Sequence, residues 1–327
     1  MVKSKKISAL LVLLLCGGML CGCSGMADQV PDQKRKVAMV VKSTETEFWK
    51  SAFAGAKAAA TEYNLDLSIQ GPDTEEDYQT QNVMVSRAVE EGAEALVFSA
   101  IDYENNVPAV EIAAQAGLEI VAIDSRADSD KISTYIGTDN YAAGRMAAKA
   151  ALQCGESQIR VGLVNYDVNS ANGQEREQGV REILEQLDNV EIVDAINVFS
   201  LAENAQARTA AMLMEHPDIN VIIAFNEPTS VGAARAVNEL KLEDKVWLVG
   251  FDSNVETVDK LQNGVVDVLI VQNPYAMGYL GVESAYKLMA GQDTEVQETV
   301  DTATVLVTRE NMFTPDCQKM LFSFAGW

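Results

Sequence analysis

Length, composition and charge already exclude several classes of protein. The chain has 327 residues, 48% of them hydrophobic and 22% charged, so it can bury one large core or two smaller ones. The 48 acidic residues outweigh 25 lysines and arginines, and this net charge of -23 argues against nucleic acid as a partner because a polyanion would be repelled over most of the surface. The single histidine excludes zinc sites that need two imidazoles.

The first residues have the pattern of a bacterial lipoprotein signal. Three lysines precede an apolar run over residues 7–15, and residues 20–23 resemble a lipobox. A transmembrane helix is the alternative, but the apolar run is short. We expect a signal peptide over residues 1–22, lipidation of Cys23 and a tether over residues 23–36. The protein would then be an extracytoplasmic lipoprotein attached to the cell membrane through its lipid.

Two of the five cysteines belong to the folded part. Cys16 and Cys21 lie in the signal and Cys23 would carry the lipid, which leaves Cys154 and Cys317. Their spacing does not show whether they form a disulfide. The absence of a CxxC motif argues against a redox enzyme.

From residue 37 onward, short continuous apolar runs alternate with helical patterns. Such runs, without alternation of apolar and polar residues, are typical of parallel strands covered on both faces. The helical patterns place apolar residues on one face, as with Val180, Ile183, Leu184 and Leu187. This order predicts an α/β fold of the doubly wound, parallel-sheet type. The predicted strands cover residues 37–41, 95–98, 120–123, 161–164, 221–225, 246–251 and 268–271.

The two halves of the chain repeat one pattern of polar residues after strands. Ser99 and Asp124 follow consecutive predicted strands in the first half, and Asn226 and Asp252 do so in the second. The repeat favours two similar α/β domains, whose carboxyl strand ends would face each other across a ligand-binding cleft. Each of these residues could instead cap the following helix or close a turn.

Motifs for nucleotide binding and covalent catalysis are absent. No GxGxxG follows the first predicted strand, and the chain has neither a GxxxxGK[ST] phosphate loop nor a GxSxG nucleophile elbow. Residues 167–178 imitate only the first positions of a calcium loop. We therefore expect no cofactor, no metal and no catalytic residues.

Several motifs, with the lipobox and the duplicated halves, resemble the type I periplasmic solute-binding proteins, in particular the ribose and galactose group. The resemblance covers about residues 37–309. The same fold forms the effector domain of lactose-repressor-type regulators, but no DNA-binding helix-turn-helix can be placed before it. The motifs are Glu47-Phe48-Trp49, Ile123-Asp124, Ile136-Gly137-Thr138-Asp139-Asn140, Gln174-Glu175-Arg176, Phe225-Asn226-Glu227, Val249-Gly250-Phe251-Asp252 and Val271-Gln272-Asn273-Pro274.

The resemblance implies a sugar site between two domains. Aromatic planes stack on the apolar C–H faces of sugars, and carboxylate, amide and guanidinium groups bond hydroxyls. Core packing is the alternative role for Phe48 and Trp49, and a solvated helix position is the alternative for Arg176. The first domain would contribute Thr46, Phe48, Trp49, Ser99, Asp124 and Thr138, and the second would contribute Arg176, Asn226, Asp252 and Gln272.

The sequence departs from the ribose-type pattern at three of these places. Thr46 stands where asparagine is usual, Glu47 replaces a proline, and Ser125 follows Asp124 where an arginine is frequent. Loss of the arginine removes a bidentate donor, which argues against ribose itself. Glu45 and Glu47 near the cleft mouth leave room for a ligand with amine character.

The crossing pattern of the family implies the domain bounds. The first domain would comprise residues 37–138 and 274–302, and the second would comprise residues 139–273 and 303–309. Three chain crossings would form a hinge between them. Residues 310–327 would be a C-terminal extension packed on a domain surface.

Three functions follow as hypotheses. The first is capture of a monosaccharide or related polyol by hinged closure, with delivery to ABC-transporter permease subunits. The second replaces delivery by presentation to a membrane sensor kinase or chemoreceptor. The third is a cleft glycosidase with Asp124 and Asp252 as its carboxylate pair. The hydroxyl-binding role that the resemblance implies for both carboxylates argues against the enzyme.

Overall fold

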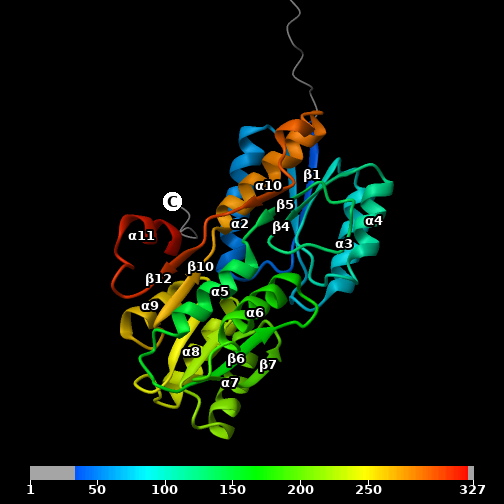
Figure 1. Cartoon of the computed structure of the whole chain (residues 1–327). Helices are drawn as coiled ribbons and strands as arrows, with labels where there is room; N and C mark the ends of the chain where they lie inside the picture. Colours follow the sequence, from blue (N-terminus) through cyan, green and yellow to red (C-terminus); the bar gives the residue numbers. More distant parts are fainter. Residues whose placement is uncertain (1–33, 323–327) are drawn as a thin grey trace, which may run out of the picture. The chain divides into compact units, whose positions relative to one another are not determined.

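The computed structural model describes residues 34–322 of the chain (Figure 1). The predicted signal peptide, the predicted lipid site Cys23 and the tether up to residue 33 lie outside the described residues, as does the end of the predicted C-terminal extension. Within the described range, no helix has the length and apolar character needed to cross a membrane.

The described chain contains two sheets, each covered by helices. The first sheet consists of β1 (Lys36–Val40), β2 (Asp66–Gln70), β3 (Ala95–Phe98), β4 (Glu119–Ile123), β5 (Thr134–Gly137) and β11 (Thr299–Asp301). The second consists of β6 (Ile159–Tyr166), β7 (Val190–Val198), β8 (Val221–Ala224), β9 (Trp247–Phe251), β10 (Val268–Val271) and β12 (Val305–Val307).

The helices divide between the two sheets. The first sheet carries α2 (Glu47–Glu62), α3 (Tyr78–Glu90), α4 (Val107–Gln115), α10 (Pro274–Met289) and the short 3-10 helix η1 (Asp293–Glu295). The second carries α5 (Asn140–Ala151), α6 (Ala171–Leu184), α7 (Ala202–Glu215), α8 (Glu227–Glu239), α9 (Val255–Asn263) and α11 (Pro315–Leu321).

The two sheets have matching strand orders. The first runs β11-β5-β4-β3-β1-β2 and the second runs β12-β10-β9-β8-β6-β7. Neighbouring strands are parallel throughout, except that the three-residue edge strand β12 is antiparallel to β10. The predicted fold class, α/β with two similar doubly wound parallel sheets, is confirmed, with this one antiparallel edge as a difference.

All seven apolar runs that predict strands form strands. β3 and β10 have the predicted bounds, and the others differ by one or a few residues at their ends. The sequence patterns did not predict β2, β5, β7, β11 and β12. Four of these, β2, β7, β11 and β12, are edge strands, which are partly exposed and so lack a continuous apolar run.

One predicted helix end is wrong by about a turn. Periodicity places Leu187 on the buried face of a helix, but α6 ends at Leu184 and Leu187 is 36% exposed in the turn that follows. Hydrophobic periodicity fixes the face of a helix better than its end, because a turn can continue the spacing for one more residue.

Each sheet has an apolar core on both faces. In β1, Val37 and Met39 join the core under α2 and α10, whereas Ala38 and Val40 join the core under α3 and α4. α2 and α10 lie side by side over the first sheet (Figure 1). The second sheet likewise separates a core beneath α5 and α6 from one beneath α7, α8, α9 and α11. Alternate residues of a strand point to opposite faces, so a strand covered twice must be apolar throughout.

Cys154 and Cys317 both have free thiols. Cys154 packs against the core beneath α5 and α6, and Cys317 on α11 is buried in the core on the opposite face of the second sheet. The sheet therefore separates the two sulfur atoms, which answers the question that their spacing left open. Leu321 shares the core with Cys317, so the described part of the C-terminal extension packs against the second sheet.

Two glycines bring α5 and α6 into close contact. A Cβ atom on Gly144 would collide with the backbone carbonyl of Arg176, and one on Gly179 would collide with that of Tyr141. Only glycine allows the two backbones to approach this closely. The contact holds the α6 backbone at Arg176 against α5, beneath the carboxyl ends of the second sheet.

The chain passes between the two sheets three times. It leaves the first sheet after β5, returns from β10 to α10, and leaves again between β11 and β12. The crossings expected near residues 138–139, 273–274 and 301–302 lie within these connections. The exact domain bounds and the hinge remain predictions.

Candidate ligand-binding site

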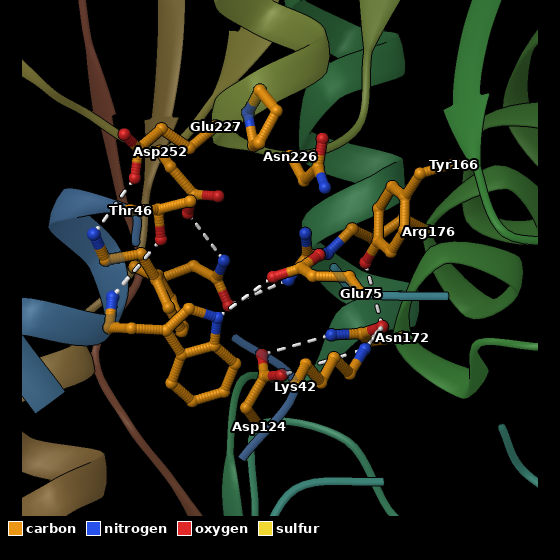
Figure 2. A pocket seen from close by; sticks show the side chains of 14 residues that line it. Lys42, Thr46, Glu75, Asp124, Tyr166, Asn172, Arg176, Asn226, Glu227 and Asp252 are labelled. Carbon is orange, nitrogen blue, oxygen red and sulfur yellow. Dashed lines mark hydrogen bonds and ion pairs between the residues drawn. The ribbon is translucent and has the colours of Figure 1, made fainter. Parts of the chain in front are cut away.

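A pocket of about 300 Å³ lies at the carboxyl ends of strands from both sheets (Figure 2). Eight of the ten predicted site residues line it, namely Thr46, Phe48, Trp49, Asp124, Arg176, Asn226, Asp252 and Gln272. The lining also includes six residues that were not predicted, namely Lys42, Glu75, Tyr166, Asn172, Glu227 and Pro228. Their role in binding a ligand remains a prediction.

The other two predicted residues lie behind the pocket wall. Ser99 Oγ donates a hydrogen bond to Asp124 Oδ2 at 3.0 Å, and Thr138 Oγ1 donates one to Gln272 Oε1 at 2.9 Å. Both hydroxyls are buried. The expectation that they lie on the wall is therefore wrong, because lining residues stand in front of them and use their hydroxyl groups as support.

Asp124 and Asp252 both have left-handed backbone conformations at strand ends. Their φ angles are 57° and 66°, values that are uncommon outside glycine but better tolerated by aspartate and asparagine. Neither residue caps a helix, since Asn254 is the N-cap of α9 and Asp124 is followed by β5. The capping alternative is thus wrong for both carboxylates.

Thr46 and Asn226 do cap helices, although they also line the pocket. Thr46 Oγ1 accepts a hydrogen bond from the backbone N–H of Trp49 at the start of α2. Asn226 Oδ1 accepts one from the N–H of Thr229 at 3.0 Å, and its Nδ2 donates to Ser200 Oγ at 2.8 Å. For these two residues the structural role and the predicted site role coincide.

Lys42 connects the two sheets at the base of the pocket. Its ammonium donates to Ser170 Oγ at 2.7 Å and to Asn172 Oδ1 at 3.1 Å, and lies 3.9 Å from Asp124 Oδ2. Asn172 Nδ2 in turn donates to Asp124 Oδ1 at 3.0 Å. Figure 2 shows Lys42, Asn172 and Asp124 together. Lys42 and Asp124 follow strands of the first sheet and Asn172 lies on α6, so these bonds hold the pocket closed at one side.

Arg176 is a buried organiser of the second half of the pocket. Only 1% of it is exposed, so the solvated alternative is wrong. Its guanidinium donates to Asn140 Oδ1, to the Phe225 carbonyl and to Gln272 Oε1 at 2.7–2.9 Å, and lies 4.7 Å from the Phe251 ring centre. Burial by itself would lower the pKa of Arg176, but the surrounding acidic groups raise it above its ordinary value. Arg176 therefore stays charged.

Asp252 is the most perturbed carboxyl group of the pocket. It is 5% exposed, and its Oδ1 accepts a hydrogen bond from Gln272 Nε2 at 2.6 Å. Burial raises the pKa of Asp252 to about 7, while the charge of Arg176 and the hydrogen bond from Gln272 oppose this rise. Near neutral pH this carboxyl group therefore exists in both protonation states.

Glu227 joins the second half of the chain to the start of α2. Its Oε2 accepts a hydrogen bond from the N–H of Phe48 at 2.9 Å, and its Oε1 accepts from Asn254 Nδ2 at 2.9 Å. The N-terminus of a helix favours negative charge through its free N–H groups. Burial nevertheless raises the pKa of Glu227 above its usual value.

Trp49 belongs both to the core of the first sheet and to the pocket lining. It is 1% exposed, and the Phe48 ring meets it edge-on with 5.1 Å between ring centres. Trp49 Nε1 donates to Glu75 Oε1 at 2.9 Å, and Glu75 Oε2 accepts from Ser200 Oγ at 2.7 Å. Trp49 therefore packs in the core of the first sheet and also lines the pocket.

Comparison with known proteins identifies the family. Residues 37–293 match the family model described as periplasmic binding protein domain. The chain belongs to this family.

Proteins similar to this chain are named for a sugar or were solved with one bound. The chain is 29% identical to the D-ribose/D-allose-binding protein of Pseudomonas aeruginosa, covering 94% of this chain and 98% of the relative. A carbohydrate transporter solute-binding protein of Agrobacterium radiobacter, solved with D-arabinose, has a TM-score of 0.86 and 27% identity and covers 89% of this chain and 99% of its own. An ABC transporter solute-binding protein of Agrobacterium vitis with bound D-fucose has a TM-score of 0.84 and 29% identity, covering 88% and 99%.

The sequence contained enough information to find some of the lining residues that were not predicted. Lys42, Tyr166 and Glu227 lie just after predicted strands, so the rule that ligands bind at carboxyl strand ends would have found them. Glu75 lies in a loop and Asn172 on a helix. Nothing in their local sequence distinguishes these two from other polar surface residues.

Proposed function

We propose that the protein is an extracytoplasmic solute-binding subunit of an ABC transporter that captures a monosaccharide or a related polyol without chemical change. The observation that carries the proposal is a pocket lined by strand ends of both sheets, in which aromatic rings lie beside buried carboxylates and amides. The names of the relatives support the sugar class.

The chemistry of the lining suits a hydroxyl-rich ring. Phe48 and Trp49 offer apolar surface to C–H faces, while Asp124 and Asp252 offer acceptors fixed by their neighbours. These features favour a hydroxyl-rich ring as the ligand.

Closure around the ligand follows from how the chain connects its two halves. Three crossings would act as the hinge, and contacts across the pocket, such as Lys42 with Asn172 and Glu75 with Ser200, would form on closing. A membrane permease would then receive the closed form. Presentation of the same form to a membrane sensor kinase or chemoreceptor is the alternative use.

The proposal includes a lipid anchor at Cys23, after removal of residues 1–22. The lipobox-like residues 20–23 support it. Expression in a bacterial host should place the wild-type protein in the membrane fraction, and Cys23→Ala should move it to the soluble fraction. Equal membrane association of the two forms would contradict the anchor.

A glycosidase is the second candidate, because Asp252 has the raised pKa that a general acid needs. Binding without turnover is favoured by the engagement of both carboxylates with protein donors. NMR of the protein with each sugar or β-glycoside that it binds decides between the two. An unchanged ligand after prolonged incubation supports capture, and a released aglycone or inverted anomer supports the enzyme.

Two measurements test capture itself. Native mass spectrometry of freshly purified protein should reveal a retained small polyol, and calorimetric titration of the emptied protein with neutral pentoses and hexoses should give a dissociation constant at or below micromolar. Failure of every sugar and every amino sugar to bind protein that is verified to be empty and folded would overturn the proposed function.

A further inference from the structure

The pocket lining has more acidic than basic side chains. Four carboxylates line it, from Glu75, Asp124, Glu227 and Asp252, against the two cations Lys42 and Arg176. A neutral sugar needs acceptors, but it does not need an excess of buried charge, which is costly unless it is paired.

Both cations are already committed to the protein. Lys42 bonds Ser170 and Asn172 and pairs with Asp124. The guanidinium of Arg176 donates hydrogen bonds to the amide oxygen of Asn140, to the backbone carbonyl of Phe225 and to Gln272 Oε1. Within residues 34–322, neither cation comes within 4.0 Å of a carboxylate oxygen other than that of Asp124, although the charge of Arg176 still favours ionised Asp252.

The remaining three carboxylates receive hydrogen bonds from neutral groups alone. Glu75 accepts from Trp49 Nε1 and Ser200 Oγ, Glu227 accepts from backbone and amide N–H groups, and Asp252 accepts from Gln272. Within residues 34–322, no lysine or arginine nitrogen comes within 4.0 Å of any of them. This excess of unpaired carboxylates is a property of the pocket lining as a whole.

Asp252 adds an unused acceptor. It is more than nine-tenths buried and lines the pocket, yet its Oδ2 has no hydrogen-bond partner among the described residues, since Gln272 bonds Oδ1. Asp252 lines the pocket, so a ligand donor that reaches Oδ2 would form a charge-assisted hydrogen bond with it.

We propose that the pocket selects a sugar or polyol that bears a protonated amine, and that Asp252 Oδ2 accepts a hydrogen bond from the ammonium group of this ligand. This inference rests on the proposed function. The amine would supply the missing positive charge. Its hydroxyls would use Asp124 and the amides, and its ring would lie against Phe48 and Trp49. An ammonium leaves water at a high free-energy cost, which hydrogen bonds to carboxylates without a cation partner help to offset.

The groups around Asp252 predict how the binding depends on pH. Arg176 favours the ionised form, whereas Glu227 and Asp124 disfavour it, and burial raises the pKa to about 7. Lys42 and Glu75 complete the charged lining. An ammonium ligand requires the ionised carboxyl group, so its affinity should rise between pH 5.5 and pH 7.5, whereas a neutral ligand should show a smaller change.

Calorimetric titration of the emptied full chain with matched pairs tests the inference. D-glucosamine and D-glucose, D-galactosamine and D-galactose, and the 3-, 5- and 6-amino analogues with their parent sugars differ by one amine. At pH 7.5 at least one amino sugar should bind about tenfold or more tightly than its parent, as a charge-assisted bond to a buried carboxylate allows.

Asp252→Asn is the diagnostic variant, because asparagine keeps the shape and tolerates the positive φ at this position. It should reduce the preference for the amino sugar over its parent by about tenfold. Asp130→Asn removes an exposed carboxylate outside the pocket and should leave the preference unchanged.

The outcomes separate the two proposals. Parent sugars that bind as tightly as every amino analogue would overturn the amine inference and leave sugar capture intact. A preference for the amino sugar that survives in Asp252→Asn would overturn the assignment to Asp252. Failure of both classes would overturn the proposed function as well.

Discussion

Asp124 and Asp252 occupy equivalent places in the two halves of the chain but differ in their electrostatic surroundings. Asp124 follows β4 and Asp252 follows β9, which hold equivalent positions in the strand orders of the two sheets. Both residues have left-handed backbone conformations and line the pocket. Asp124 lies 3.9 Å from the ammonium of Lys42, whereas Asp252 has no cation within ion-pair distance among the described residues. The duplicated fold thus places two similar acceptors in one pocket, with different tendencies to hold a proton.

Asp252→Asn should change how stability depends on pH. The raised pKa means that ionised Asp252 opposes folding. The free energy of unfolding of the wild type therefore falls as pH rises from the pKa of this residue in the unfolded chain to its pKa of about 7 in the folded protein. Asparagine removes this loss. Relative to the wild type, the free energy of unfolding of the variant should increase by about 2 kcal/mol between pH 5.5 and pH 8.

Urea denaturation of ligand-free protein at both pH values measures this change. Asp316→Asn, on an exposed residue of α11, is the matched control and should track the wild type. A constant difference between Asp252→Asn and the wild type across this pH range would contradict the raised pKa.

Arg176→Met should destabilise the protein by about 3 kcal/mol, because three buried acceptors lose their donor. Ligand affinity should fall too, since Gln272 would lose its position. Arg181→Met on the same helix removes only partly exposed ion pairs with Glu177 and Glu185, and should cost less than about 1 kcal/mol. Thermal and urea melts of the two variants make the comparison, and equal losses would show that the guanidinium of Arg176 has no special role.

Lys42→Met should favour the open form. The change removes the bonds to Ser170 and Asn172 that join the two halves and leaves Asp124 without its cation. Small-angle scattering should therefore give a larger radius of gyration for the variant than for the wild type, and ligand affinity should fall about tenfold. Lys50→Met, on an exposed lysine of α2, is the control. Superimposable profiles of Lys42→Met and the wild type, with and without ligand, would count against a hinge closed by this contact.

Trp49 should affect both folding and binding. Trp49→Ala removes a fully buried ring, which should cost about 3–5 kcal/mol in unfolding free energy, together with about 1–3 kcal/mol in ligand affinity. Trp49→Phe keeps an aromatic plane and loses the bond to Glu75, so both losses should be smaller. Trp247→Phe, outside the pocket, should leave affinity unchanged. Normal affinity in Trp49→Phe and Trp49→Ala alike would assign Trp49 to the core alone.

The local pattern of the sequence was enough to predict the fold class and three residues of the pocket lining, Asp124, Asn226 and Asp252. The other predicted lining residues came from the resemblance to the family. A strand covered on both faces must be apolar at every position, so β3 and β10 are visible as continuous runs. Polar residues at the ends of such strands, such as Asp124 and Asp252, must lie at the ligand-binding edge of a parallel sheet. These conclusions need no knowledge of how distant segments meet.

The tertiary structure alone decided which groups pair across the pocket and which lie behind it. Glu75 reaches Ser200 and Glu227 reaches the start of α2 only because the two sheets meet at their carboxyl ends. Ser99 is hidden behind Asp124, and Arg176 is buried because glycines let α5 and α6 approach. Hydrophobic periodicity indicates whether a residue is buried. The residues that bury it lie far away in the chain, and strand order and packing determine which they are.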